Sequence, residues 1–174
     1  MTKKETVCEI RKIFSEVYAE AECSLDYKDP LQLLISTQLA AQCTDKRVNM
    51  VTPALFARYK TAEDFANADL LELEEYIKST GFFRNKAKNI IGCCRRLVSC
   101  YDSKVPDNME DLTSLPGVGR KTANIIIGDI YGKPAVVVDT HAKRITKRIG
   151  LTKNTDPVKV EFDLIKILPS DYTF

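Results

Sequence analysis

The 174-residue sequence lacks the long apolar segments found in membrane and secreted proteins. Its first residues, MTKKETVCEIRK, contain no apolar run of secretory type. Nothing elsewhere approaches the roughly 18 uninterrupted apolar residues that a membrane-spanning helix requires. We therefore expect a soluble, cytoplasmic protein with no membrane partner. A chain of this length buries about 70% of its unfolded surface, enough for a core without disulfide bonds.

Cysteine motifs of metal sites are also missing. No C-x2-C pair occurs, and the Cys93-Cys94 doublet with Cys100 lacks the spacing of a zinc site. Most of the six cysteines lie among apolar neighbours in segments of helical pattern. We expect reduced thiols packed in the core, with no metal ion bound, at Cys8, Cys23, Cys43, Cys93, Cys94 and Cys100.

Strand patterns are nearly absent. Only the run AVVV at 135–138 places β-branched residues after a proline, and a single strand would have no partner for its hydrogen bonds. We interpret it as an extended, buried segment leading to a helix near Asp139. No long linker, low-complexity segment or internal repeat occurs. The sequence thus predicts an all-α protein of about nine or ten short helices.

Helical patterns cover most of the chain. Residues 5–22 repeat apolar side chains at steps of three and four, the period of an amphipathic helix. Asp29 before Pro30 predicts a capped helix start, and the segment after it is apolar almost all round, as in a buried helix. A cap followed three residues later by an acid predicts two more starts, near 62 and 108, at Thr61 with Asp64 and at Asp107 with Glu110.

Net charge is small but unevenly distributed. The whole chain carries +2. Between Leu115 and Lys153, eight Lys and Arg residues oppose only Asp129 and Asp139, a local charge of +6. Basic charge is therefore concentrated in one segment, as in proteins that bind nucleic acid.

That basic segment begins with a glycine-containing turn. Residues 108–131 predict a short helix, a tight turn at 116–119 and a second helix from about Arg120. Gly117 and Gly119 would allow positive φ and close approach of the backbone to a ligand. The N–H groups at the start of the second helix would then form an anion site suited to a phosphate. A plain helix–helix turn explains the glycines equally well.

Lys121 lies in the first turn of the predicted second helix. The helix dipole and the adjacent Arg120 both disfavour a charged ammonium there, and a neutral amine is a nucleophile. A structural lysine would be more stable at the other end of the helix. Physical reasoning alone divides equally between phosphate contact and nucleophilic attack.

Asp139 and His141 open the next helical segment. Asp139 fits an N-cap, and it also fits a carboxylate that faces Lys121 across a cleft and stabilises positive charge on a sugar. His141 is the only histidine, and we interpret it as a packing or hydrogen-bonding residue rather than a catalytic one. The following KRITKR places four cations on one helical face, either solvated or on a phosphate backbone: Lys143, Arg144, Lys147 and Arg148.

These motifs together resemble the endonuclease III family of DNA glycosylases. LPGVGRKTAN at 115–124 and VVVDTHAKR at 136–144 are similar to its helix-hairpin-helix and aspartate motifs. Upstream, DPLQLLISTQLAAQCTDKRVN and GFFRNKAKNI are similar to its buried helix with an AQ-x-TD element and to its G-x-x-x-N-K-A loop. The resemblance covers about residues 28–167.

The resemblance implies a role for each matching residue. Lys121 would be the nucleophile on C1′ of a damaged nucleotide, Asp139 its activating carboxylate, and the resulting Schiff base would permit β-elimination. Gln42 would enter the duplex where the base has left, and Phe82 would be the apolar wedge, a position at which the family often has leucine. The substrate pocket would include Asp45 and His141. Phosphates would be held by the hairpin residues Gly117, Val118, Gly119 and Arg120.

The resemblance also implies an architecture and partners. It predicts two helical lobes with a DNA-binding cleft between them, one of residues 23–133 with the hairpin, and one of residues 1–22 plus 134–174. The partner would be double-stranded DNA with a damaged base or abasic site, bound by a monomer that associates with the nucleoid if bacterial. The hairpin carbonyls would accommodate a monovalent cation.

One cofactor of the family has no ligands in this sequence. Endonuclease III proteins hold a [4Fe–4S] cluster on a C-terminal C-x6-C-x2-C-x5-C array, and none of the six cysteines has that spacing. We expect the cluster only if the native protein continues past Phe174, with the second lobe incomplete here. Two alternatives to a bifunctional enzyme are a mismatch glycosylase of the same superfamily, which lacks the lysine, and a non-catalytic hairpin module that binds DNA.

Overall fold

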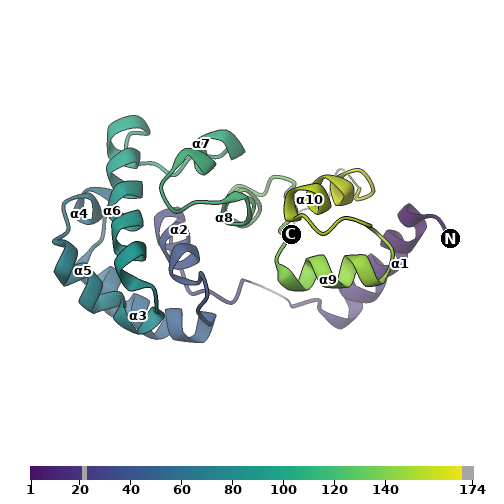
Figure 1. Cartoon of the computed structure of the whole chain (residues 1–174), viewed down its shortest axis with the longest axis horizontal. Helices are drawn as coiled ribbons and strands as arrows, with labels where there is room; N and C mark the ends of the chain where they lie inside the picture. Colours follow the sequence, from purple (N-terminus) through teal and green to yellow (C-terminus); the bar gives the residue numbers. More distant parts are fainter. Residues whose placement is uncertain (21–22, 170–174) are drawn as a thin grey trace. The chain divides into compact units, whose positions relative to one another are not determined.

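The computed structural model describes residues 1–20 and 23–169. Its regular structure there is helical, with no strand, which confirms the all-α prediction. The helices (Figure 1) are α1 Lys3–Val17, α2 Pro30–Leu39, α3 Asp45–Arg58, α4 Ala62–Ala66, α5 Leu70–Ile77, η1 Lys78–Thr80, α6 Phe83–Cys100, α7 Met109–Ser114, α8 Arg120–Ile125, η2 Ile126–Ile130, α9 Thr140–Arg148 and α10 Pro157–Ile165.

The chain divides into two compact units. One comprises Met1–Glu22 with Ile127–Phe174, and the other comprises Cys23–Ile126. The unit of residues 23–126 is continuous in sequence, and the other unit is assembled from both ends of the chain. In the described ranges, no helix has the length and apolarity needed to cross a membrane.

The core of the 23–126 unit is built around α2. Residues Leu33 to Leu39 are all buried, which explains why this helix is apolar almost all round. Helices α3, α6 and α8 contact it from different sides (Figure 1). The largest side chains below 2% exposure in this unit are Tyr59, Phe65, Leu33, Leu34, Ile35, Leu39, Leu55, Leu73, Ile77, Ile90, Leu97 and Leu112.

The other unit has a smaller core. Its buried side chains come from α1, from the segment before α9, from the loop after α9 and from α10: Val7, Val136, Val138, Leu151, Val160 and Leu164. The run at 135–138 belongs to no helix or strand and is mostly buried, and its burial was predicted. Helix α1 ends at Val17, short of the expected 22, and residues 21–22 of that prediction lie outside the described residues.

Local capping explains where several helices begin. The Asp29 carboxylate accepts a hydrogen bond from the Gln32 N–H at 2.9 Å, with Pro30 at the first helical position. Thr61 and Asp64 form the expected capping box. The predicted cap at Asp107 is wrong by one residue, because Asn108 has the extended backbone of a cap and its side chain accepts from the N–H at 111.

The cysteines are free thiols, but the prediction that most are in the core is wrong. Only Cys93 and Cys94 are buried, and burial raises the pKa of Cys93 to about 12. Cys43 is half-buried, while Cys8 and Cys100 lie on the solvent faces of amphipathic helices. The apolar neighbours of a cysteine in sequence do not decide which helix face it occupies.

Candidate nucleic-acid interface

The predicted hairpin is present between α7 and α8. Its turn is closed by a hydrogen bond from the Val118 N–H to the Leu115 carbonyl at 3.1 Å, and Val118 is buried. Gly117 has φ +76°, as predicted. Gly119 does not have positive φ: at φ −97° and ψ 175° it is the extended N-cap of α8. The two glycines therefore serve different purposes.

Gly117 is required by a close approach within the 23–126 unit. A Cβ atom there would lie 2.6 Å from Oε1 of Gln38 and 2.8 Å from Cβ of Asn89. Gly119 has open space instead, since an added Cβ would meet no atom within 4 Å. The turn thus packs closely against α2 and α6 at Gly117, whereas Gly119 faces open space.

Gly117→Ala should destabilise the protein by about 2 kcal/mol or more, because the new methyl meets two neighbours and the backbone has positive φ. Gly119→Ala is the matched control and should cost about 1 kcal/mol or less. Urea unfolding at equilibrium measures both. Equal losses for the two variants would contradict the close seating of Gly117.

Lys121 lies on the exposed surface in the first turn of α8. No side chain caps this helix, because its N-cap is a glycine. After Ile125 the chain continues into the π-helical turn η2, a feature frequently found at functional sites. Arg120, the first residue of α8, is half-buried. The lysine is therefore held on a short ordered helix with its side chain accessible to a large ligand.

Asp139 caps the N-terminus of α9. Its Oδ1 atom accepts a hydrogen bond from the Ala142 N–H at 2.7 Å, and the residue is half-buried. The N-cap interpretation is confirmed, and the carboxylate role in chemistry is compatible with it.

Asp45, at the first position of α3, is half-buried and accepts a hydrogen bond from the Ser24 hydroxyl.

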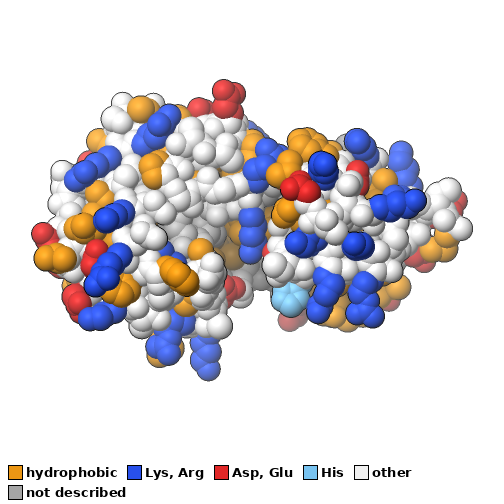
Figure 2. Space-filling model, viewed as in Figure 1, with side chains coloured by type: hydrophobic (Ala, Val, Ile, Leu, Met, Phe, Trp, Pro, Cys, Tyr) orange, Lys and Arg blue, Asp and Glu red, His pale blue; other side chains and the backbone are white. Residues whose placement is uncertain are grey.

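Helix α9 presents a basic surface. None of its residues is buried, and Lys and Arg side chains lie over it (Figure 2). Arg144, Lys147 and Arg148 are exposed and Lys143 is half-buried. The exposed His141 ring has its Nδ1 atom 3.4 Å from Nη2 of Arg144, so a hydrogen-bonding interpretation fits and a packing interpretation does not.

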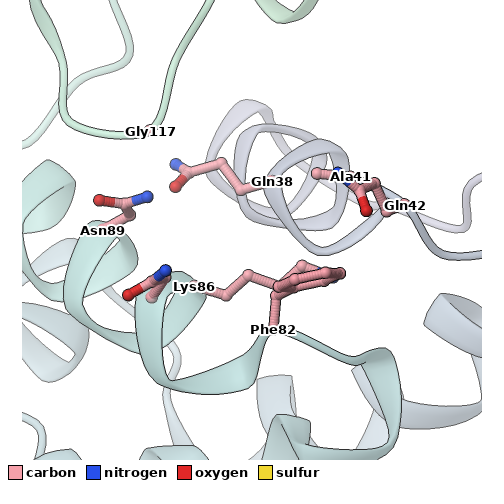
Figure 3. A pocket seen from close by; sticks show the side chains of 8 residues that line it. Gln38, Ala41, Gln42, Phe82, Lys86, Asn89 and Gly117 are labelled. Atoms are coloured by element: carbon pink, nitrogen blue, oxygen red, sulfur yellow. The ribbon is translucent and has the colours of Figure 1, made fainter.

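Gln42 and Phe82 line the same pocket, although 40 positions separate them in the sequence (Figure 3). Both are exposed, Phe82 by 66%, and both have positive φ, 53° and 48°. Few residues other than glycine adopt this backbone conformation, and it recurs at functional sites. The pocket of about 180 Å³ is smaller than the roughly 300–1,000 Å³ of typical small-molecule sites.

Sequence reasoning missed the other polar residues of this pocket: Gln38, Asn85, Lys86 and Asn89. Gln38 is 5% exposed, and neither its Nε2 nor its Oε1 atom has a hydrogen-bond partner among the described residues. The signal available in the sequence was a glutamine near the end of the mostly apolar helix α2. Figure 3 shows Gln38, Asn89 and Gly117 on one side of the pocket.

Comparison with known proteins decides the family. A family model described as HhH-GPD superfamily base excision DNA repair protein matches residues 35–170. Endonuclease III of Synechocystis sp. is 56% identical over 169 residues, which cover 97% of this chain and 77% of that protein. The chain belongs to the endonuclease III family. Endonuclease III of Bacillus subtilis is 43% identical over 157 residues, covering 90% of this chain and 72% of the relative.

Solved structures of endonuclease III share the fold. A non-covalent endonuclease III–DNA complex matches with a TM-score of 0.92 and 41% identity, over 98% of this chain and 80% of the other. A trapped endonuclease III–DNA covalent intermediate matches with a TM-score of 0.93 and 41% identity, over 98% and 81%. Both are structures of endonuclease III bound to DNA.

The endonuclease III family carries a [4Fe–4S] cluster, which needs four cysteine ligands. Across residues 1–20 and 23–169, no three Cys, His, Asp or Glu side chains are grouped closely enough to hold a metal ion. Cys93 and Cys94 are buried in α6, and Cys8 is exposed on α1. The described residues do not fit the cluster.

Proposed function

We propose that this chain is a bifunctional DNA glycosylase and abasic-site lyase of base excision repair. The observation that carries the proposal is Lys121, exposed in the first turn of the helix that follows the hairpin, in a chain 56% identical to an endonuclease III. Its substrates are oxidised or ring-saturated pyrimidines in double-stranded DNA. The enzyme acts in the cytoplasm, and on the nucleoid if bacterial.

The chemistry follows from an amine nucleophile. The Lys121 Nζ atom attacks C1′, the N-glycosidic bond breaks, and the base leaves with the bonding electron pair and takes up a proton. The aminal then opens to a Schiff base, with O4′ protonated. Loss of a C2′ proton expels the 3′ phosphate by β-elimination, which cuts the strand. The Asp139 carboxylate stabilises the positive charge that develops on the sugar and handles protons.

Three groups of residues contact the DNA. The hairpin backbone at 117–119, with Arg120, holds phosphates at the start of α8. The cations of α9 contact the phosphate backbone. Gln42 fills the space left by the extruded base while Phe82 wedges the opposite stack, a division that their shared pocket and exposed positions support. Asp45 and His141 contribute to the substrate pocket.

Borohydride trapping tests the proposed function. Borohydride reduces a Schiff base to a stable amine, so incubation with duplex DNA containing an abasic site should produce a covalent protein–DNA adduct. A mismatch glycosylase that lacks the lysine, or a hairpin module that only binds DNA, forms none. Absence of an adduct with DNA that the protein demonstrably binds would reject the proposal.

Replacing the four α9 cations with Ala should flatten the salt dependence of DNA binding. Each lost phosphate contact lowers the slope of log K against log salt by about 0.9 on B-DNA, so four contacts remove about 3.6. Titration by fluorescence anisotropy at several salt concentrations gives the slope. The matched control replaces four exposed cations of the other unit, Lys60, Lys78, Arg96 and Lys104, and should change it less. An unchanged slope in the α9 variant would mean that these side chains only face solvent.

Two cofactor assignments complete the proposal. The protein would carry the family [4Fe–4S] cluster only on cysteines beyond Phe174, because the described ones are not grouped. The hairpin carbonyls would bind a monovalent cation.

A further inference from the structure

The segments that carry Gln42 and Phe82 both follow the end of a helix. Gln42 comes three residues after Leu39, the last residue of α2, and Phe82 comes two residues after Thr80, the last residue of η1. Both Gln42 and Phe82 have positive φ. A residue other than glycine keeps this conformation only when its surroundings hold it there. Something in the fold must therefore fix these two turns.

One side chain joins both helix ends. The ammonium of Lys86 donates hydrogen bonds to the Leu39 carbonyl and to the Thr80 carbonyl, each at 2.8 Å. Lys86 is only 6% exposed and lies in α6, one turn after Phe82. Its stem passes along the pocket beside Phe82, below Gln38 and Gln42 (Figure 3).

The charge of Lys86 suits this position. Carbonyl groups at the end of a helix lack partners within the helix and carry the negative end of its dipole. A buried cation between two such ends satisfies both. Burial opposes the charge and lowers the pKa of Lys86, so an apolar side chain would avoid that cost but could not join the two carbonyls.

We propose that Lys86 is a positioning residue that fixes the spacing between Gln42 and Phe82, and that DNA distortion depends on this spacing. The inference rests on the proposed function, in which these two side chains occupy the unstacked duplex. Lys86 touches neither the substrate nor Lys121 in this scheme. It acts indirectly. Its hydrogen bonds to the Leu39 and Thr80 carbonyls fix the two turns that carry Gln42 and Phe82.

The experiment compares two substrates. One is duplex DNA containing a thymine glycol, where a base must leave the stack and the gap must be filled. The other is a single-stranded oligonucleotide with a preformed abasic site, where there is no stack to hold open. Lys86→Met keeps most of the length of the side chain and removes both hydrogen bonds. It should slow base release from the duplex about 10- to 100-fold, as expected for misplaced positioning groups. β-elimination on the single strand should change by less than about threefold.

Gln42→Ala and Phe82→Ala are the matched controls, since they should show the same selective loss. If Lys86 acts through them, Lys86→Met should cost much less in the Gln42→Ala/Phe82→Ala double variant than in the wild type. Full additivity, equal losses on both substrates, or no loss on either would overturn the inference.

A folding defect is separated from a positioning defect by far-UV circular dichroism. Should Lys86→Met fail to reach the wild-type spectrum, Lys86→Gln replaces it, because its amide still donates to one carbonyl. The same selective loss, smaller in size, is then expected, and an equal loss on both substrates would overturn the proposal. Inactivity of the unaltered chain on both substrates would reject the proposed function and this inference with it.

Discussion

Lys121→Gln is expected to keep DNA binding and to lose both base release and strand cutting. Glutamine has a similar length and remains polar, but its amide nitrogen is not a nucleophile and cannot form a Schiff base. Removing a covalent nucleophile typically costs on the order of 10⁴- to 10⁶-fold in kcat. Single-turnover assays on duplex DNA with thymine glycol measure both steps, and borohydride trapping should give no adduct.

The control for Lys121→Gln is Lys143→Gln, which removes the same charge from α9 rather than from the hairpin. It should weaken binding and leave the single-turnover rate at saturating protein nearly unchanged. An undiminished adduct with Lys121→Gln would show that another amine attacks. Retained strand cutting by Lys121→Gln would show that another amine performs the lyase step.

Asp139→Asn is expected to slow base release by about 10²- to 10⁴-fold while leaving the fold intact. Asparagine caps a helix as well as aspartate does, so the bond to the Ala142 N–H, now 2.7 Å, is preserved. What disappears is the negative charge. The substitution therefore separates the two functions that one side chain performs.

The matched variant is Asp139→Ala, which removes the charge and the cap together. It should lose activity to the same extent and lower the free energy of unfolding by a further ~1 kcal/mol. Urea unfolding and single-turnover rates of the two variants give the comparison. Wild-type base release by Asp139→Asn would reduce Asp139 to an N-cap.

Local rules predicted much of the fold. Caps at Asp29 and Thr61 act within three residues of themselves, so their helix starts could be identified without tertiary information. The helix start at Asp139 could be identified in the same way, although the same local sequence also fits a carboxylate that takes part in the chemistry. Rules of this kind become ambiguous where two residues that can cap a helix are adjacent, and Asn108 rather than Asp107 is the N-cap of α7.

The wrong prediction for the cysteines concerns a property that depends on neighbours distant in sequence. Cys8 and Cys100 have apolar neighbours along the chain, yet both are exposed because the helix face that carries them is uncovered. Both hairpin glycines would allow positive φ, but Gly119 has the extended backbone of the α8 N-cap, and of the two only Gly117 requires glycine. That requirement comes from Gln38 and Asn89, which lie about 80 and 28 positions earlier in the chain.

Caps, helical periodicity and the LPGVGRK motif are local or contiguous patterns, so the sequence alone predicted the helical fold and the hairpin. Lys121 became the candidate nucleophile only through the resemblance to the endonuclease III family, because physical reasoning left phosphate contact and attack equally open. Only the tertiary structure showed that Gln42 and Phe82 line one pocket, and that Lys86 joins the two helix ends behind them. These contacts join residues that are far apart in the sequence. A hydrogen bond from Lys86 to Leu39 spans 47 positions, and no local preference specifies which carbonyl a buried ammonium will meet.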